Sequence, residues 1–173
     1  MKQLLYIFMA ALLTGCAGGS SKSDNASDAT PYDSVMRAKG YDMVPFFKTR
    51  TGHITVTLQV NGKRCVFLVD TGGGATLIDI SKKDFYQLSP LAVTDYAAGI
   101  GSATPLVRTT GMFSINGTEF RNDSLYLMDI SYVNAEFKKT RSRRVDGVLG
   151  TDFLERHKAI IDYSRSALYL LKP

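Results

Sequence analysis

The tripeptide Asp70-Thr71-Gly72 is the part of this sequence best suited to chemistry. It follows the apolar run at residues 66–69 and leads into a further run of small residues that begins Gly73-Gly74. A carboxylate is therefore placed where a buried strand gives way to a glycine-rich loop. The strand fixes the position of the carboxylate, and the glycines allow backbone N–H groups to approach it. The pattern indicates a single acid held for proton transfer.

A second motif, Val148-Leu149-Gly150, stands near the C-terminus and is followed by Thr151-Asp152-Phe153-Leu154. Together the two motifs resemble the retropepsin-like aspartic proteases, the single-domain relatives of pepsin. In that family the first motif carries the catalytic aspartate, and the second packs beneath it and leads into a short helix. The stretch 148–170 is most similar to the bacterial lipoprotein branch. The resemblance covers residues 45–173, which we expect to form one retropepsin-like domain.

Peptide hydrolysis without a metal or a nucleophilic side chain needs two adjacent carboxyl groups, one charged and one neutral, to activate a water molecule. This chain has one Asp-Thr-Gly, so a symmetric homodimer would supply the second copy. The resemblance implies that Asp70 is catalytic. It also implies that Thr71 hydrogen-bonds across the two-fold axis and that Gly72 brings its N–H to the carboxylate. The sequence departs from the family pattern in two ways: Gly73 stands where Ala or Ser is usual, and Thr151 and Gly74 replace an Arg–acid pair of the retroviral members.

Small residues dominate residues 95–113 and form the centre of a predicted hairpin. In the family this position resembles the flap that closes over substrate, which implies that Gly99, Ile100 and Gly101 bind substrate. Without the family context, an ordinary surface hairpin is the alternative. The leading function is thus a membrane-anchored aspartic endopeptidase that acts on a peptide or protein substrate. The alternative is a lipoprotein with the same fold that binds a peptide or a partner without cutting it.

Other titratable residues are weaker candidates. We expect Asp152 to cap a helix, Asp146 to lie in a turn and Asp79 to end a strand. His53 and His157 have no Cys or second His at ligand spacing and are expected in solvated or capping roles. We therefore expect no metal and no cofactor.

The N-terminus has the pattern of a bacterial secretion signal. An apolar run at residues 4–13 is too short for a stable membrane span and ends in Leu13-Thr14-Gly15-Cys16. That ending resembles the lipoprotein box, which implies a signal peptide at residues 1–15 and lipid on Cys16; an ordinary signal peptide with a chance Cys is the alternative. Residues 16–44 would be the lipidated Cys and a flexible tether. Ala17 after the Cys favours the outer membrane, facing the periplasm.

The formal net charge of +5 comes largely from one basic run at residues 138–144. A solvated loop is the ordinary interpretation of such a run. The functional alternatives are attraction to acidic peptides or to an anionic envelope surface. Nucleic acid is not an expected partner, because no aromatic residues interleave with the basic ones.

The elements that must position Asp70 are predicted to be short strands. Residues 54–60 alternate apolar and polar side chains, and Asn61-Gly62 supplies the two positive-φ positions of a tight hairpin. Asn116-Gly117 marks a second hairpin, and Cys65 is expected to be a buried, inert thiol. The fold class is all-β: a closed, acid-protease-like barrel of six or more strands with a flap hairpin and one or two short helices. Expected strands besides those named are 63–69, 76–80, 125–128, 159–163 and 167–171, and the expected helices lie after residue 81 and at 151–157.

Overall fold

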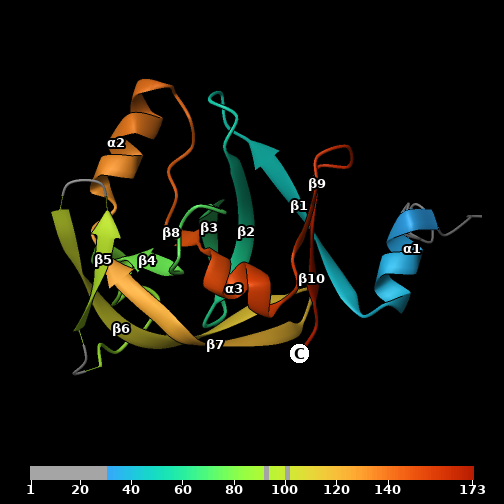
Figure 1. Cartoon of the computed structure of the whole chain (residues 1–173), viewed down its shortest axis with the longest axis horizontal. Coiled ribbons are helices and arrows are strands. Elements are labelled where there is room, and N and C mark those ends of the chain that lie inside the picture. The colour runs from blue at the N-terminus through green and yellow to red at the C-terminus, as the bar shows by residue number, and fades with distance from the viewer. Residues whose placement is uncertain (1–30, 92–93, 100–101) are drawn as a thin grey trace, which may run out of the picture.

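A computed structural model describes residues 31–91, 94–99 and 102–173 (Figure 1). The described part is mostly β, with ten strands in one sheet and three α-helices. The strands are β1 (Tyr41–Lys48), β2 (Ile54–Val60), β3 (Lys63–Val69), β4 (Leu77–Asp79), β5 (Thr94–Gly99), β6 (Ser102–Ile115), β7 (Thr118–Met128), β8 (Gly147–Leu149), β9 (Ile160–Asp162) and β10 (Ala167–Leu171). The helices are α1 (Pro31–Ala38), α2 (Ser131–Lys139) and α3 (Thr151–Arg156), with a 3-10 helix at Ile80–Lys82.

The strand order is β5-β6-β7-β4-β8-β3-β2-β1-β10-β9, and an added pairing of β2 with β6 turns part of the sheet into a ring. That pairing joins Val60 to Phe113, and both side chains are fully buried. The structure confirms that the chain is mostly β, which is the coarser part of the predicted all-β class. The closed barrel stays a prediction.

Two apolar clusters cover the two faces of the central strands. The larger lies inside the ring and includes Phe67, Phe113 and Phe153. The smaller includes Val66 and Leu68 of β3 and Phe137 of α2, so it lies between the outer face of the sheet and that helix. Four successive side chains of β3, residues 65–68, are buried for this reason. The burial of Cys65 among them confirms the prediction of an enclosed thiol.

Both predicted two-residue hairpins are present. Asn61 and Gly62 have φ values of 46° and 77°, and Val60 pairs with Lys63 across the turn. Asn116 and Gly117 have φ values of 50° and 84° in the β6–β7 turn. An L-residue other than Asn, Asp or Gly is strained at such angles, so the sequence fixes both turns locally.

The number of helices corrects the sequence analysis, which allowed one or two. Helix α3 was predicted, whereas α2 was not, because it is a short segment in which only Asn134 and Phe137 are buried. The half-buried Val133 lies four residues before Phe137, and both join the outer cluster. Among the described helices, none has the length and apolarity needed to cross a membrane.

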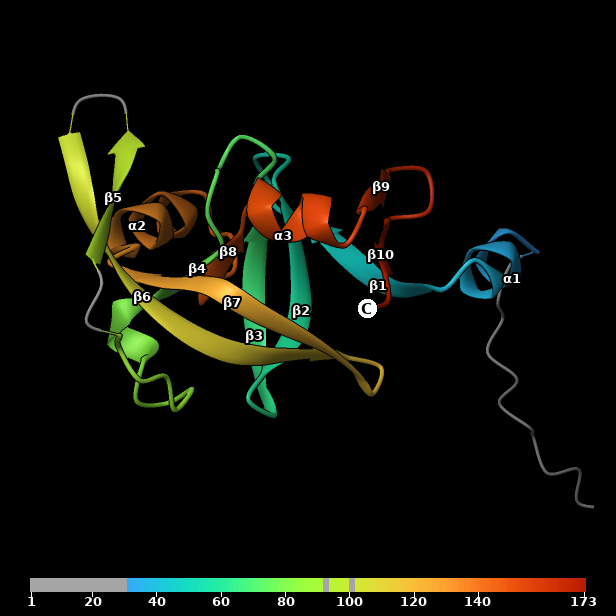
Figure 2. The same cartoon turned by 60° about the horizontal axis from the view of Figure 1, so that its bottom comes forward.

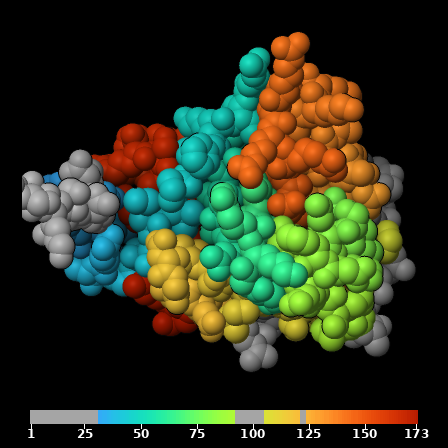
Figure 3. All heavy atoms as spheres, turned by 180° about the vertical axis from the view of Figure 1, so that it is seen from behind, coloured from blue at the N-terminus to red at the C-terminus, as the bar shows by residue number. Residues whose placement is uncertain are grey.

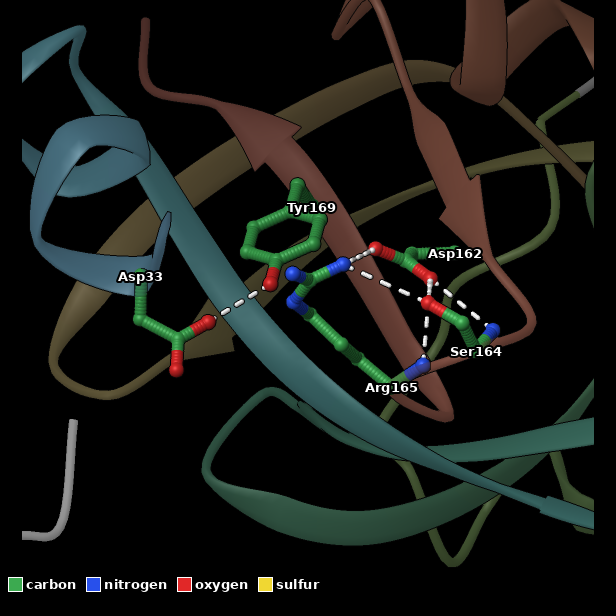
Figure 4. A network of polar contacts seen from close by, with 5 residues as sticks. All are labelled: Asp33, Asp162, Ser164, Arg165 and Tyr169. Atoms are coloured by element: carbon green, nitrogen blue, oxygen red, sulfur yellow. Dashed lines mark hydrogen bonds and ion pairs between the residues drawn. The ribbon is translucent and has the colours of Figure 1, made fainter. Parts of the chain in front are cut away.

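Regular secondary structure is present before residue 45, because α1 and β1 occupy much of the segment 31–44. Strand β1 pairs with β10 over Tyr41 to Pro45 and so crosses the expected domain boundary. Tyr169 of β10 donates a hydrogen bond to Asp33 of α1 at 2.6 Å (Figure 4). The Arg165 guanidinium lies 4.2 Å from the centre of the Tyr32 ring. Asp162 in turn accepts hydrogen bonds from Ser164 and Arg165, which lower its pKa to about 2. This network fastens α1 to the C-terminal hairpin.

Candidate active site

Asp70 lies at the end of β3, beside the end of β8. The two strands are parallel and pair Val69 with Leu149, while β8 also pairs antiparallel with β4. Because β8 lies between β3 and β4, the connecting loop at residues 70–76 must pass over the end of β8. The two motifs, almost eighty residues apart in sequence, therefore meet at one edge of the sheet.

Gly150 is where the two motifs touch. A Cβ atom on this buried residue would lie 2.5 Å from the backbone carbon and oxygen of Ala75. No side chain fits at that distance, so glycine is required by close approach of two backbones. Gly147, at the start of β8, is equally confined, with the Leu77 oxygen 2.4 Å from where its Cβ would be.

Backbone hydrogen bonds hold the loop around Asp70. The Asp70 N–H donates to the Leu149 oxygen at 3.0 Å, and the Gly72 N–H donates to Asp70 Oδ1 at 2.9 Å. Thr151 donates twice to the Gly73 oxygen, from its N–H at 2.7 Å and from its hydroxyl at 3.2 Å. Gly73, the middle residue of the run of three glycines, is thus hydrogen-bonded to the residue that directly follows the second motif. Thr151 stands where the resemblance stated above implies an Arg in the retroviral members, so its two hydrogen bonds supply a different attachment at that position.

A buried polar group links the loop to α3. The Thr76 hydroxyl donates to Asp152 Oδ1 at 2.6 Å and accepts the Gly150 N–H at 3.0 Å. Asp152 Oδ1 also accepts the Phe153 N–H at 2.7 Å. The N-cap of α3 is Gly150 and not Asp152, which corrects the predicted capping role. Asp152 instead holds Thr76, so its carboxylate is committed to structure.

The remaining weak candidates also have structural partners. Asp146 Oδ2 accepts the Val66 N–H at 3.0 Å, and Asp79 Oδ1 accepts the Ser81 N–H at 3.0 Å. His157 was expected to be solvated or capping. Its backbone does end α3, but its ring is buried between Phe120 and Phe153, with centroid distances of 4.8 and 4.5 Å. Burial lowers the pKa of His157. Among the described residues, no three His, Cys, Asp or Glu side chains gather as a metal site.

Asp70 itself is half-buried and opens onto a shallow cavity of about 290 Å³. Thr71 lines this cavity and also a neighbouring one of about 340 Å³ along α3. No second carboxylate lines the Asp70 cavity within the described part of the chain. The Thr71 side chain is exposed and makes no hydrogen bond to any described residue. The site therefore has one acid and one unpaired hydroxyl at its open face.

The predicted flap falls on the β5–β6 hairpin, whose arms pair from Thr94–Val107 to Gly99–Ser102. Gly99 ends β5, whereas Ile100 and Gly101 lie outside the described residues. Figure 2 shows the arms of this hairpin rising beside α2 on the side of the molecule to which loop 70–76 also rises. Thr76 and Thr151 were not predicted from the sequence as supports of the site. The only signal for Thr76 was a polar residue at the start of an apolar strand.

Comparison with known proteins agrees with this arrangement. A family model described as aspartyl protease matches residues 56–153, from β2 to α3, and the chain belongs to that family. A retropepsin-like aspartic protease from Rickettsia conorii has a similar structure, with a TM-score of 0.51 and 20% identity over 76% of this chain and 89% of that one. The fold is thus retropepsin-like. The retroviral protease-like domain of Ddi1 from Leishmania major matches at a TM-score of 0.47, with 15% identity over 69% of this chain and 92% of that chain.

Proposed function

We propose that this protein is an aspartic endopeptidase whose active site forms when two copies of the chain bring their Asp70 side chains together. The observation that carries the proposal is the Asp70 site itself: one acid in an open cavity, with an exposed and unpaired Thr71 beside it. A two-fold axis next to Thr71 would place a second Asp70 opposite the first. It would also give each Thr71 hydroxyl a partner in the other subunit.

Two carboxyl groups held at contact distance share one proton, because both cannot be charged at low cost. The charged Asp70 would take a proton from a water molecule as that water attacks the peptide carbonyl. The neutral Asp70 would donate its proton to the carbonyl oxygen. The Gly72 N–H bond to Oδ1 and the Asp70 N–H bond to Leu149 would keep each carboxylate in place during both transfers. The β5–β6 hairpin, with Gly99, Ile100 and Gly101, would cover the bound peptide.

The test is cleavage of a denatured protein over a pH series by the wild type and by Asp70→Asn. The variant keeps the Oδ1 acceptor for Gly72 but has no titrating group, so hydrolysis should fall by at least about a hundredfold. Asp84→Asn is the matched control, because the Asp84 side chain is exposed and its ion pair with Lys83 lies at the surface. If Asp70→Asn cleaves as fast as the control, the assignment is wrong. Retained binding of the denatured protein by a wild type that never cleaves would favour the non-catalytic alternative.

The shared site has its own test. Specific activity should rise with protein concentration and level off once dimers dominate in sedimentation. Excess Asp70→Asn should inhibit the wild type by forming mixed dimers. Constant specific activity in a range where the protein sediments as a monomer would contradict the shared site.

The membrane anchor is a further part of the proposal. The Leu13-Thr14-Gly15-Cys16 box supports lipid on Cys16, with attachment to the outer membrane facing the periplasm. Several acyl chains hold a protein on a membrane stably, whereas one does so marginally. Cys16→Ser should therefore move the protein from the membrane fraction to the soluble fraction. Unchanged retention, with an unmodified N-terminal peptide by mass, would exclude the anchor.

A further inference from the structure

A further cavity, of about 330 Å³ and called the basic cavity below, lies on the other side of the β1–β2 turn from Asp70. One wall is the end of β1 and the turn that follows it, and the other is the loop after α2. Figure 3 shows these two segments side by side on the back of the molecule. The floor is formed by the outer face of β2 and β3, where Val66 is buried.

Among the described residues, the cavity is lined by four cationic side chains, Lys48, Arg50, Arg141 and Arg143, and by no carboxylate. None of the three arginines forms an ion pair with a residue that the structure describes. Asp146 is bonded to the backbone of Val66 but does not line the cavity. Positive charge that is gathered in a hollow and left uncompensated attracts anions more strongly than scattered charge does.

Both walls are ordered by their own hydrogen bonds. In the β1–β2 turn, the Thr49 N–H donates to the His53 oxygen at 2.8 Å, and the hydroxyls of Thr49 and Thr51 lie 3.0 Å apart. In the opposite loop, the Ser142 N–H donates to the Phe137 oxygen at 2.8 Å. The ring centres of His53 and Phe137 lie 5.8 Å apart, so the segments that carry the two walls are also close to each other beside the cavity. The arginines thus stand on a framework that exists before any ligand binds.

The basic cavity and the Asp70 cavity are neighbours. Residues 48–50 line the first and residues 51–54 line the second. Lys48 Nζ also lies 4.9 Å from the centre of the Tyr163 ring, and Tyr163 lines the Asp70 cavity. A substrate peptide bound at Asp70 therefore has to cross only the β1–β2 turn to reach the arginines. Phe47, which is 66% exposed, adds an apolar surface of the kind that a peptide covers.

We propose that this cavity binds acidic side chains of the protein substrate, at a distance along the chain from the bond that is cut. The inference rests on the proposed peptidase function for the nature of the ligand. Clustered cations next to a catalytic site increase the association rate and the selectivity for acidic chains. Salt should weaken this preference, because the arginines face solvent.

The test uses the full chain carrying Asp70→Asn and a fluorescein-labelled peptide with a run of glutamates, compared with the same peptide carrying glutamines. Binding is followed by anisotropy at low and high salt. A triple variant carries Arg50→Gln, Arg141→Gln and Arg143→Gln. Its preference for the acidic peptide, measured as the ratio of the two dissociation constants, should be about tenfold smaller. The matched control changes Lys39, Lys138 and Arg144 to Gln, which removes the same charge outside the cavity. The control should keep the preference.

Equal losses in the two triple variants would overturn the proposal, since net charge alone would then explain binding. Displacement of the acidic peptide by inorganic phosphate or by a short-chain phosphatidylglycerol at equal or lower concentration would also overturn it, in favour of a small anion or a lipid headgroup. With the catalytic Asp70 restored, the kcat/KM ratio of acidic to neutral substrates should fall in the arginine variant alone. Arginine-dependent binding by a wild type that never cleaves would support the cavity and reject the peptidase.

Discussion

Two loops meet at the end of the central strands, and they are built in opposite ways. The loop at residues 70–76 exposes Thr71 and Gly72 and leaves the Asp70 carboxylate at an open face. The segment at residues 147–152 begins with four buried residues, and its Asp152 is bound to Thr76. The Asp70 carboxylate therefore accepts the Gly72 N–H and faces the open cavity, whereas the Asp152 carboxylate is bound to a buried hydroxyl and supports the fold. The two carboxylates differ because their surroundings in the folded chain differ.

The largest effect should come from forcing the two loops apart. Gly150→Ala would place a methyl group 2.5 Å from the Ala75 backbone, so the loop that carries Asp70 has to move. We expect a loss of about 3 kcal/mol or more in the free energy of unfolding, or failure to fold. Urea denaturation is the measurement. Gly74→Ala is the control, because nothing lies within 4 Å of its Cβ and its φ is not positive. A stable Gly150→Ala protein would show that the loops are not in close contact.

Removing the polar link between the loops should have the next largest effect. Thr76→Val keeps the shape of a fully buried side chain but leaves the Gly150 N–H without an acceptor. The expected loss is about 2 kcal/mol, since an unsatisfied buried donor keeps its desolvation cost. The companion variant Thr71→Val alters an exposed threonine, and it should leave the free energy of unfolding of the dilute protein unchanged. Equal stabilities for the two variants would remove the distinction between the loops.

The two aspartates can be compared directly by the same substitution. Asp152→Asn replaces a carboxylate whose Oδ2 is buried without a described partner, and removes negative charge from the first turn of α3. We expect a loss of about 1 kcal/mol in unfolding free energy. Asp70→Asn should change stability by less than about 0.5 kcal/mol while it abolishes hydrolysis. Chemical denaturation of both variants in parallel checks this, and a reversed order would contradict the roles assigned here.

The smallest effect concerns pH and the far end of α3. Because burial lowers the pKa of His157, the unfolded chain binds this proton more tightly than the folded one. The stability that comes from the neutral ring is complete above the unfolded pKa of about 6.5 and is lost as the pH falls below it. His157→Gln should therefore reduce the fall in the free energy of unfolding between pH 7.5 and 5.5, by less than about 1 kcal/mol. The exposed His53, changed to Gln, is the control, and equal slopes for wild type and His157→Gln would exclude this source of acid sensitivity.

Local sequence patterns predicted the pieces of the fold well. The β2–β3 and β6–β7 turns followed from Asn-Gly pairs, because those residues tolerate positive φ wherever they occur. The strands around Asp70 followed from their apolar runs. Helix α2 was missed because its stability comes from packing Phe137 on the outer face of the sheet, which a short segment does not reveal by itself.

By itself, the sequence determined the chemistry that this protein has available: one Asp-Thr-Gly after a buried strand, a second apolar-apolar-Gly motif and one basic run. The tertiary structure decided which groups meet, because contacts between residues far apart depend on strand order and not on local preference. It set Gly150 against Ala75, bound Asp152 to Thr76 and buried His157 among phenylalanines. It also divided the basic run. Lys138 and Lys139 lie in α2, whereas Arg141 and Arg143 line a cavity together with Lys48 and Arg50, at and just after the end of β1.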